Sequence, residues 1–221
     1  MSGLRERNKE RRRQAILDAA LELLRANDIE SVTIEQIAAL AEVSPPTIYN
    51  LIGTREQLLV ALVDRISEDL IGRFEPPDGE IDDPIGAMRL AVDETVAAFV
   101  ADSAAYRQIV RALGNLAVAG SRHAFDASAL HVYGMRRAQA LGILRDDLDP
   151  VALGRQSFLA YVAALTTWAA GRLADRGFGI AARHGMMTVL AAASSDAYRA
   201  AHQEEFSELG TQLARVSWSQ R

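Results

Sequence analysis

The sequence predicts an all-α protein of about nine helices, and two observations carry this prediction. Helix-favouring residues (Ala, Leu, Arg, Glu and Gln) dominate the 221 positions, and no alternating strand pattern of useful length occurs. Helix starts are also marked by capping side chains and by prolines in the first turn. We expect an N-terminal three-helix helix-turn-helix domain, joined through a fourth helix to a C-terminal helical bundle.

The first helix is indicated by an apolar stripe from Ile16 to Leu24 and should end near Asn27 and Asp28. The next three helices are predicted from their caps, which are Thr33 with Gln36, Ser44 followed by Pro45, and Thr54 with Gln57. The fourth helix continues to Leu70, because its apolar residues keep a helical spacing up to that point.

A loop at 75–80, which contains two prolines and a glycine, predicts a boundary between domains. The boundary separates an N-terminal domain at 9–70, which contains the helix-turn-helix at 34–53, from a C-terminal helical domain at 80–216. The latter is expected to contain helices near 84–102, 104–118, 122–142, 150–175 and 179–216. Gly120, Gly142 and Gly177 are the expected helix stops.

Composition narrows the function classes. With 49% hydrophobic and 24% charged residues the chain is of globular type, and the absence of cysteine excludes disulfides, thiolate zinc sites and a cysteine nucleophile. The first residues lack an apolar signal core, and the most apolar run, 157–171, is too short to span a bilayer. These observations predict a soluble, cytoplasmic protein.

The stretch 33–55 carries the functional signal. Two short helices joined by a tight turn can form a helix-turn-helix if the first is small where they cross, and Ala38 and Ala41 supply that smallness. The second helix keeps Thr47, Tyr49 and Asn50 polar, and such side chains contact phosphates and base edges. Taken singly, Tyr49 could be a half-buried aromatic and Thr47 a local cap.

In these residues the chain resembles the TetR family of transcriptional regulators. The resemblance covers about 9–70 and is carried by Val32-Thr33-Ile34, Ile37-Ala38, Val43-Ser44, Thr47-Ile48-Tyr49, Gly53-Thr54-Arg55-Glu56 and Leu58-Leu59. It implies that the second helix enters the major groove, with Thr47 and Tyr49 on phosphates. The residues expected to contact DNA are Thr33, Ser44, Pro45, Pro46, Thr47, Tyr49, Asn50 and Arg55.

Three positions depart from the family pattern. Glu42 occupies the turn position where the family often has Gly, so it requires either an unfavourable backbone or a different turn. Leu51-Ile52 replaces the common His-Phe, and Arg55 replaces the usual Lys. These departures put the sequence preference in question and leave the fold prediction unchanged.

The charge distribution is uneven. Net charge is -5, and residues 1–60 hold eight Lys/Arg against nine Asp/Glu, so DNA affinity must depend on arrangement. Six of the basic residues lie in the first thirteen positions: Arg5, Arg7, Lys9, Arg11, Arg12 and Arg13. This arm could meet phosphate, or it could be a solvated start of the first helix.

The resemblance implies that 9–70 is a DNA-binding domain and that 80–216 is a ligand-binding and dimerisation domain. It also implies a homodimer paired through the last two helices. The apolar stripe Phe158, Val162, Leu165 and Ala169 is the candidate seam, with packing inside one chain as the alternative. It also implies a small-molecule pocket, whose candidate residues are Phe99, Tyr106, Arg107, Arg111, His131, Tyr133, Tyr161 and Trp168, with His123 and Phe125 as further candidates. Arg107 and Arg111, one turn apart, could clamp an anion or simply form salt bridges.

The resulting hypothesis is a ligand-responsive DNA-binding regulator, most simply a repressor, that binds a palindromic operator as a dimer. A small molecule in the bundle would move the fourth helix and change the spacing of the two recognition helices. The alternative is a bundle that only dimerises or binds protein. An all-helical enzyme is remote, because His123 and His131 have no third ligand at a convincing spacing, and neither a cofactor nor a metal is predicted.

Overall fold

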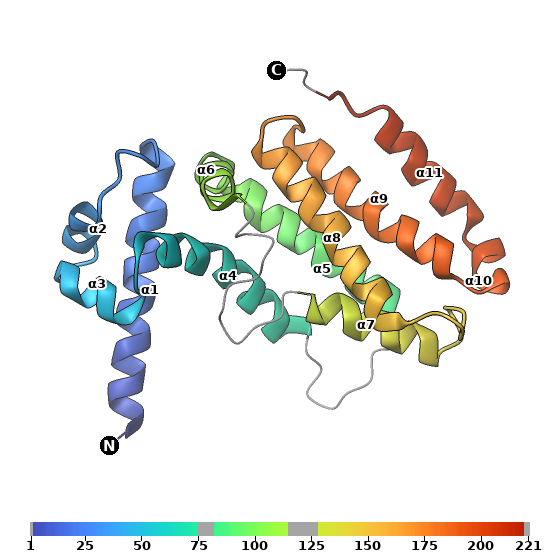
Figure 1. Ribbon diagram of the computed structural model, residues 1–221, viewed down its shortest axis with the longest axis horizontal. Coiled ribbons are helices and arrows are strands. Elements are labelled where there is room, and N and C mark those ends of the chain that lie inside the picture. The colour runs from blue at the N-terminus through green and yellow to red at the C-terminus, as the bar shows by residue number, and fades with distance from the viewer. Residues whose placement is uncertain (1, 75–81, 115–127, 219–221) are drawn as a thin grey trace.

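The computed structural model describes residues 2–74, 82–114 and 128–218, and the predicted all-α class is confirmed within them (Figure 1). These residues form eleven helices. Their bounds are α1 Ser2–Ala26, α2 Ile34–Leu40, α3 Pro45–Leu51, α4 Arg55–Phe74, α5 Pro84–Ala101, α6 Ser103–Leu113, α7 Ala129–Ala140, α8 Pro150–Ala169, α9 Asp175–Ala193, α10 Asp196–Ala201 and α11 Gln203–Ala214.

The first three helices form one end of the molecule, and α4 leads from them toward the remaining helices (Figure 1). Ile16, Leu17 and Leu24 of α1 are almost completely buried, and they meet Ile37 of α2 and Ile48 of α3 in a common core. The apolar stripe of the first helix therefore packs as its spacing predicted.

The predicted caps at Thr33 and Thr54 are confirmed. The Thr33 hydroxyl accepts from the Gln36 N–H at 3.2 Å, while the Gln36 side chain accepts from the Thr33 N–H at 2.8 Å. Thr54 and Gln57 make the same reciprocal pair at 3.3 and 2.7 Å. Each box satisfies two N–H groups that a helix start would otherwise leave without partners.

In the C-terminal part, α8 packs between α7 and α9, both of which contact α5, and α11 lies along the outer side of α9 (Figure 1). Trp168, Phe178, Met135 and Met186 are fully buried at the centre of these helices. Contact between α7 and α8 is close at Gly154, where a Cβ would stand 2.5 Å from the Val132 Cα. None of the described helices is both long and apolar enough to cross a membrane.

Two predicted helices are wrong in extent. The helix expected over 150–175 ends at Ala169, because Gly171 adopts φ 76°, a left-handed conformation that glycine tolerates. The helix expected over 179–216 is three helices, α9 to α11, and α9 already starts at Asp175. Gly177 therefore lies inside α9 and is not a stop, whereas Gly142, with φ 71°, does follow the end of α7.

The break after α9 is built from polar contacts at Ser194, which has extended backbone (φ -64°, ψ 148°). Its hydroxyl donates to the Leu190 carbonyl at 2.6 Å, and the Arg199 guanidinium donates to the Ser194 carbonyl at 2.9 Å. The Arg145 N–H also donates to the Ala193 carbonyl at 3.0 Å. These partners satisfy the carbonyls that a continuous helix would have bonded internally.

The other predicted helices agree in position where they can be compared, except that the helix at 104–118 ends earlier than predicted. The helix at 84–102 is α5, and the Asp83 side chain caps it by accepting from the Gly86 N–H at 2.8 Å. The helix at 104–118 corresponds to α6, which ends at Leu113 before Gly114 with φ 49°. The described part of the helix at 122–142 is α7, while Gly120 and the loop at 75–80 lie outside the described residues.

Candidate nucleic-acid interface

The turn between α2 and α3 is a Schellman motif that contains a non-glycine residue. The Val43 N–H donates to the Ala38 carbonyl at 2.9 Å, and the Glu42 N–H donates to the Ala39 carbonyl at 3.3 Å. Between these bonds Glu42 takes φ 53°, the left-handed conformation that usually selects glycine. Of the two alternatives for Glu42, the strained backbone is therefore correct, and the turn has its usual form.

The α2–α3 pair is held by small and aliphatic side chains, as predicted. Ala38 is 1% exposed and Ile48 is completely buried, while Ala41 and Val43 are half-buried against the same core. Because Ile48 anchors the middle of α3, Tyr49 and Asn50, which follow it, are directed toward solvent.

The exposed side of α3 carries most of the residues predicted to contact DNA. Tyr49 is 54% exposed, which is unusual for a large aromatic side chain. Ser44, Pro46 and Asn50 are exposed as well, and Pro45 and Thr47 are half-buried. In Figure 1, α3 lies at the end of the molecule away from α8, α9 and α11, so this side is not covered by the bundle.

Ser44 and Thr47 form a hydroxyl pair at the start of α3. Their Oγ and Oγ1 atoms are 2.9 Å apart, and the Ser44 side chain makes no capping bond to the helix backbone. Ser44 is thus the N-cap in backbone conformation only. A pair of hydroxyls uses one O–H internally and leaves the other free to donate, for example to a phosphate oxygen.

Arg55 and Thr33 are engaged within the protein. The Arg55 guanidinium donates to the carbonyls of Val32 and Ile29, and thereby ties the start of α4 to the segment before α2. Two of its five N–H groups are used in this way, which leaves three for another acceptor. The Thr33 hydroxyl accepts from the Gln36 N–H and keeps its own hydrogen available.

The basic arm is helical, and its basic residues are exposed except Arg13, which is half-buried. It forms the first turns of α1, which project beyond α3 in Figure 1. Lys9 pairs with Glu6 at 3.7 Å and Arg13 with Glu10 at 3.8 Å. Four more arginines lie on the same stretch of helix, namely Arg5, Arg7, Arg11 and Arg12.

One contact between α1 and α6 was not predicted from the sequence. The Gln108 side chain accepts from the Ile29 N–H at 2.8 Å, and its amide lies 3.4 and 3.3 Å from the carbonyls of Leu24 and Asn27. It therefore bonds backbone groups exposed by the end of α1. No sequence pattern marks this role, because Gln108 is 79 residues away from Ile29 along the chain.

The aromatic candidates for the ligand pocket pack against one another. The Phe99 ring lies 5.1 Å from Tyr106 and 6.3 Å from Trp168, both edge-on, and Trp168 stacks on Phe178 at 5.1 Å. Phe99, Tyr106 and Trp168 are at most 3% exposed. In this arrangement the three rings form part of the hydrophobic core.

The two candidate arginines do not act together on one group. Arg107 lies 4.4 Å above the Trp168 ring and donates to Asp175 at 2.8 Å. Because Asp175 also accepts from the Trp168 indole at 2.7 Å, these hydrogen bonds lower its pKa despite partial burial. Arg111 is exposed and donates to the Arg107 carbonyl at 3.2 Å.

The polar candidates at the α7–α8 contact are buried. The His131 Nδ1 lies 2.9 Å from the Ser157 hydroxyl, and burial lowers the pKa of His131 to about 4. Tyr161, one turn beyond Ser157, has a buried hydroxyl with no hydrogen-bond partner among the described residues, and burial raises its pKa. Tyr133 is half-buried, and His123 and Phe125 lie outside the described residues.

The stripe predicted as a dimer seam packs inside the chain. Val162, Leu165 and Ala169 are at most 5% exposed, and Phe158 is half-buried with its ring 5.9 Å from His131. The prediction of a seam at these side chains is therefore wrong, and the alternative of packing within the monomer is correct. The exposed side of α8 is formed by other residues, among them Leu159 and Ala163.

Comparisons with known proteins agree with the geometry of the N-terminal helices. Residues 16–62 match the bacterial regulatory proteins of the tetR family. The HTH-type transcriptional regulators TcmR of Streptomyces glaucescens and BetI of Rhizobium meliloti (strain 1021) are 36% and 35% identical over 87 and 80 residues. These matches cover 39% and 36% of this chain and span 38% and 34% of the relatives' own lengths.

Solved structures share the fold over a larger part of the chain. Thermus thermophilus FadR, a TetR-family repressor solved with lauroyl-CoA, covers 80% of this chain and 93% of its own at a TM-score of 0.62 and 22% identity. SmeT, the repressor of a Stenotrophomonas maltophilia efflux pump, matches over 83% of this chain and 91% of its own length, at a TM-score of 0.60 and 23% identity. The N-terminal helix-turn-helix domain of this chain therefore belongs to the TetR family of bacterial regulatory proteins.

Proposed function

We propose that the protein is a transcriptional repressor that binds a palindromic DNA operator as a homodimer and is released by a small molecule. The observation that carries the proposal is the exposed side of α3, where Tyr49 and Asn50 project to solvent from a helix anchored by Ile48. Residues 9–70 would bind DNA, and residues 80–216 would pair the protomers and bind the effector. Its relatives are named as regulators, which supports this role over that of an enzyme.

Pairing of two protomers would use the exposed side of α8. Leu159 is 47% exposed, and the exposed Ala163 and Ala170 follow it at helical spacing, which allows a second helix to approach closely. Two recognition helices are then presented about 34 Å apart, one turn of DNA. The pairing would thus use α8 together with α9. The two helices that follow, α10 and α11, would lie outside the paired helices.

The effector would bind at the α7–α8 contact, beside the Tyr161 hydroxyl. A buried hydroxyl without a partner costs about 1–3 kcal/mol, and an effector with a polar group there would recover that energy. His131 on α7, whose ring nitrogen lies 2.9 Å from the Ser157 hydroxyl one turn before Tyr161, would form the opposite wall. The lauroyl-CoA complex of the Thermus FadR supports the idea that helices arranged in this way can admit a ligand.

The second candidate is a DNA-binding dimer whose bundle has no small-molecule ligand. It is favoured by the packing of Phe99, Trp168 and Phe178 into a continuous aromatic core.

Among the residues that the structure describes, no group of three or more His, Asp or Glu side chains could hold a metal ion.

The test is fluorescence anisotropy with DNA from a random-sequence selection, repeated over a salt series. We expect saturation at two protomers per palindrome and an affinity that falls steeply with salt, because several phosphates are contacted. Affinity equal to that for scrambled DNA would refute the operator-binding proposal. A small-molecule screen on the same assay separates the two candidates, since only the first allows release of the DNA.

A further inference from the structure

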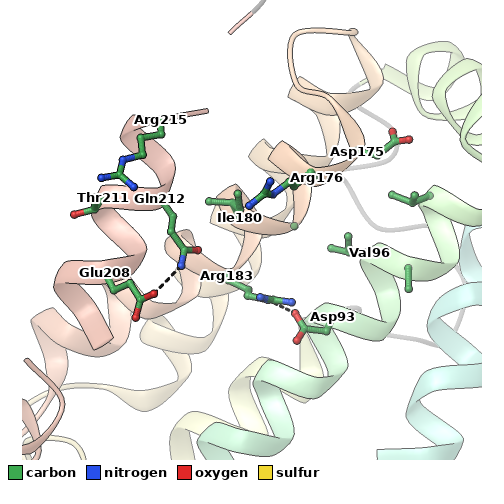
Figure 2. A pocket seen from close by; sticks show the side chains of 13 residues that line it. Asp93, Val96, Asp175, Arg176, Ile180, Arg183, Glu208, Thr211, Gln212 and Arg215 are labelled. Carbon is green, nitrogen blue, oxygen red and sulfur yellow. Dashed lines mark hydrogen bonds and ion pairs between the residues drawn. The ribbon is translucent and has the colours of Figure 1, made fainter. Parts of the chain in front are cut away.

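A groove of about 660 Å³ lies between α5, α9 and α11, on the outer side of the bundle (Figure 2). Its floor is apolar and consists of Val96 and Val100 of α5 with Ile180 of α9. Gly179 lies beside Val96 and adds no side chain to this floor. A Cβ at position 179 would stand 3.5 Å from Val96, which is an ordinary van der Waals contact. Aliphatic side chains exposed in a groove favour contact with an apolar group.

The ends of the groove can be identified from two contacts. Arg183 of α9 pairs with Asp93 of α5 at one end. At the other end Val216, just after α11, packs against Gly177 in the first turns of α9. Arg176 and Arg183 mark the two ends along α9, and seven residues of helix separate them by about 10 Å.

The acidic side chains of the groove already have partners. Asp93 binds Arg183, and Asp175 accepts from both Arg107 and Trp168. Glu208 of α11 accepts from the Gln212 amide at 3.2 Å, forms no ion pair with a described side chain and lies toward the Arg183 end (Figure 2).

Two arginines at the opposite end have no such partners. Arg176 of α9 and Arg215, which directly follows α11, line the groove, and neither makes a hydrogen bond or ion pair with any side chain that the structure describes. The groove thus has a positive end, an apolar middle and a negative charge, from Glu208, at the other end.

We propose that this groove binds a small amphipathic carboxylate. The carboxylate lies between Arg176 and Arg215, whose planar guanidinium groups match its two oxygens, and the apolar chain lies on Val96, Val100 and Ile180. Glu208 disfavours the reverse orientation by repulsion between like charges. The site is separate from the interior effector site proposed above, and its occupation does not depend on DNA binding.

The test is isothermal titration of the full chain with octanoate, in the absence of DNA. We expect saturable binding at one site per chain. Arg176→Ala and Arg215→Ala should each weaken it about 5- to 10-fold, since each removes a charge-assisted contact that is partly exposed to solvent. Arg172→Ala, at an exposed arginine outside the groove, is the matched control and should bind octanoate with unchanged affinity.

Two further measurements make the assignment specific. Octanamide, which has the same length and no charge, should bind at least 5-fold more weakly than octanoate. Gly179→Leu should abolish binding, because its side chain occupies the floor, and circular dichroism will show that the variant is folded. Absence of saturable binding, equal affinity for octanamide, or undiminished binding by the Arg176→Ala/Arg215→Ala double variant would overturn the proposal, whatever the result with DNA.

Discussion

The guanidinium of Arg25, near the end of α1, donates two hydrogen bonds to the Asp102 carboxylate at the junction of α5 and α6, over 2.5 and 2.8 Å. This bidentate contact raises the pKa of Arg25, chiefly through the hydrogen bond. Together with the Gln108 contacts it joins the helix on which α2 and α3 pack to the start of α6. A movement of α6 would therefore be passed to α1 directly, and not only through α4.

We expect the Arg25–Asp102 pair to orient the two parts without adding much stability. Arg25 is 51% exposed, so a double-mutant cycle with Arg25→Ala and Asp102→Asn should give a coupling energy below about 1 kcal/mol. Urea unfolding at 0.1 and 1 M NaCl measures it, and salt should reduce it further. A coupling above about 2 kcal/mol that is insensitive to salt would contradict this prediction.

The left-handed backbone at Glu42 predicts a stabilising substitution. Glu42→Gly removes a Cβ that is unfavourable at φ 53°, and it should raise the free energy of unfolding by about 0.5–1 kcal/mol. Glu42→Ala is the control, because it removes the charge and keeps the Cβ, so its stability should stay close to that of the parent. Equal stabilisation by both would show that charge, and not backbone strain, is relieved.

Local chemistry made the N-terminal helices predictable from the sequence. The capping boxes at Thr33 and Thr54 need partners only three residues away, so the pattern and the structure coincide. The C-terminal helices depend on distant partners. Ser194 ends α9 because Arg199 and the segment at 143–145 satisfy the carbonyls there, and a sequence with continuous helical periodicity gives no sign of this.

The candidate site shows the same difference between features set by neighbouring residues and features set by distant partners. Exposure of Tyr49 and Asn50 follows from the spacing around Ile48, which the sequence displays. The periodicity of Phe158, Val162 and Leu165 showed that they share one face, but not whether this face meets another helix of the same chain or a second protomer. Arg107 illustrates a third case, since its partner Asp175 is 68 residues away and only the folded chain reveals the pair.

Tyr49→Phe should weaken binding to the selected operator by about 0.5–1.5 kcal/mol, if its exposed hydroxyl donates to a phosphate. The fold should be unaffected, because the hydroxyl of this 54% exposed side chain has no structural role in the core. Anisotropy titration measures the change, with Tyr198→Phe on α10 as the control of equal chemistry. Unchanged operator affinity in folded Tyr49→Phe protein would argue against the phosphate contact.

Two helical glycines predict opposite responses to the same substitution. Gly154→Ala should destabilise the protein by about 1–3 kcal/mol, because the new methyl would stand 2.5 Å from the Val132 Cα and force α7 and α8 apart. Gly179→Ala meets only the end of Val96 at 3.5 Å, so the higher helix propensity of alanine should stabilise by up to about 1 kcal/mol. Denaturant unfolding of both variants compares them, and similar stabilities would contradict the close α7–α8 contact.

Burial of His131 predicts a loss of stability in weak acid. Its pKa is about 4 in the folded protein and about 6.5 in an unfolded chain, so between these values the unfolded state binds more protons. The stability contribution is complete above pH 6.5 and should fall by up to about 1.4 kcal/mol per pH unit toward pH 4.

His131→Asn should remove this part of the pH dependence, because Asn can place an amide nitrogen near the Ser157 hydroxyl and does not titrate. His184→Asn, at a half-buried histidine of α9, is the matched control and should keep it. The measurement is the free energy of unfolding in urea at intervals from pH 7 to pH 4. The same slope in His131→Asn and the parent protein would mean that another group binds the protons, and that His131 is not held neutral at the α7–α8 contact.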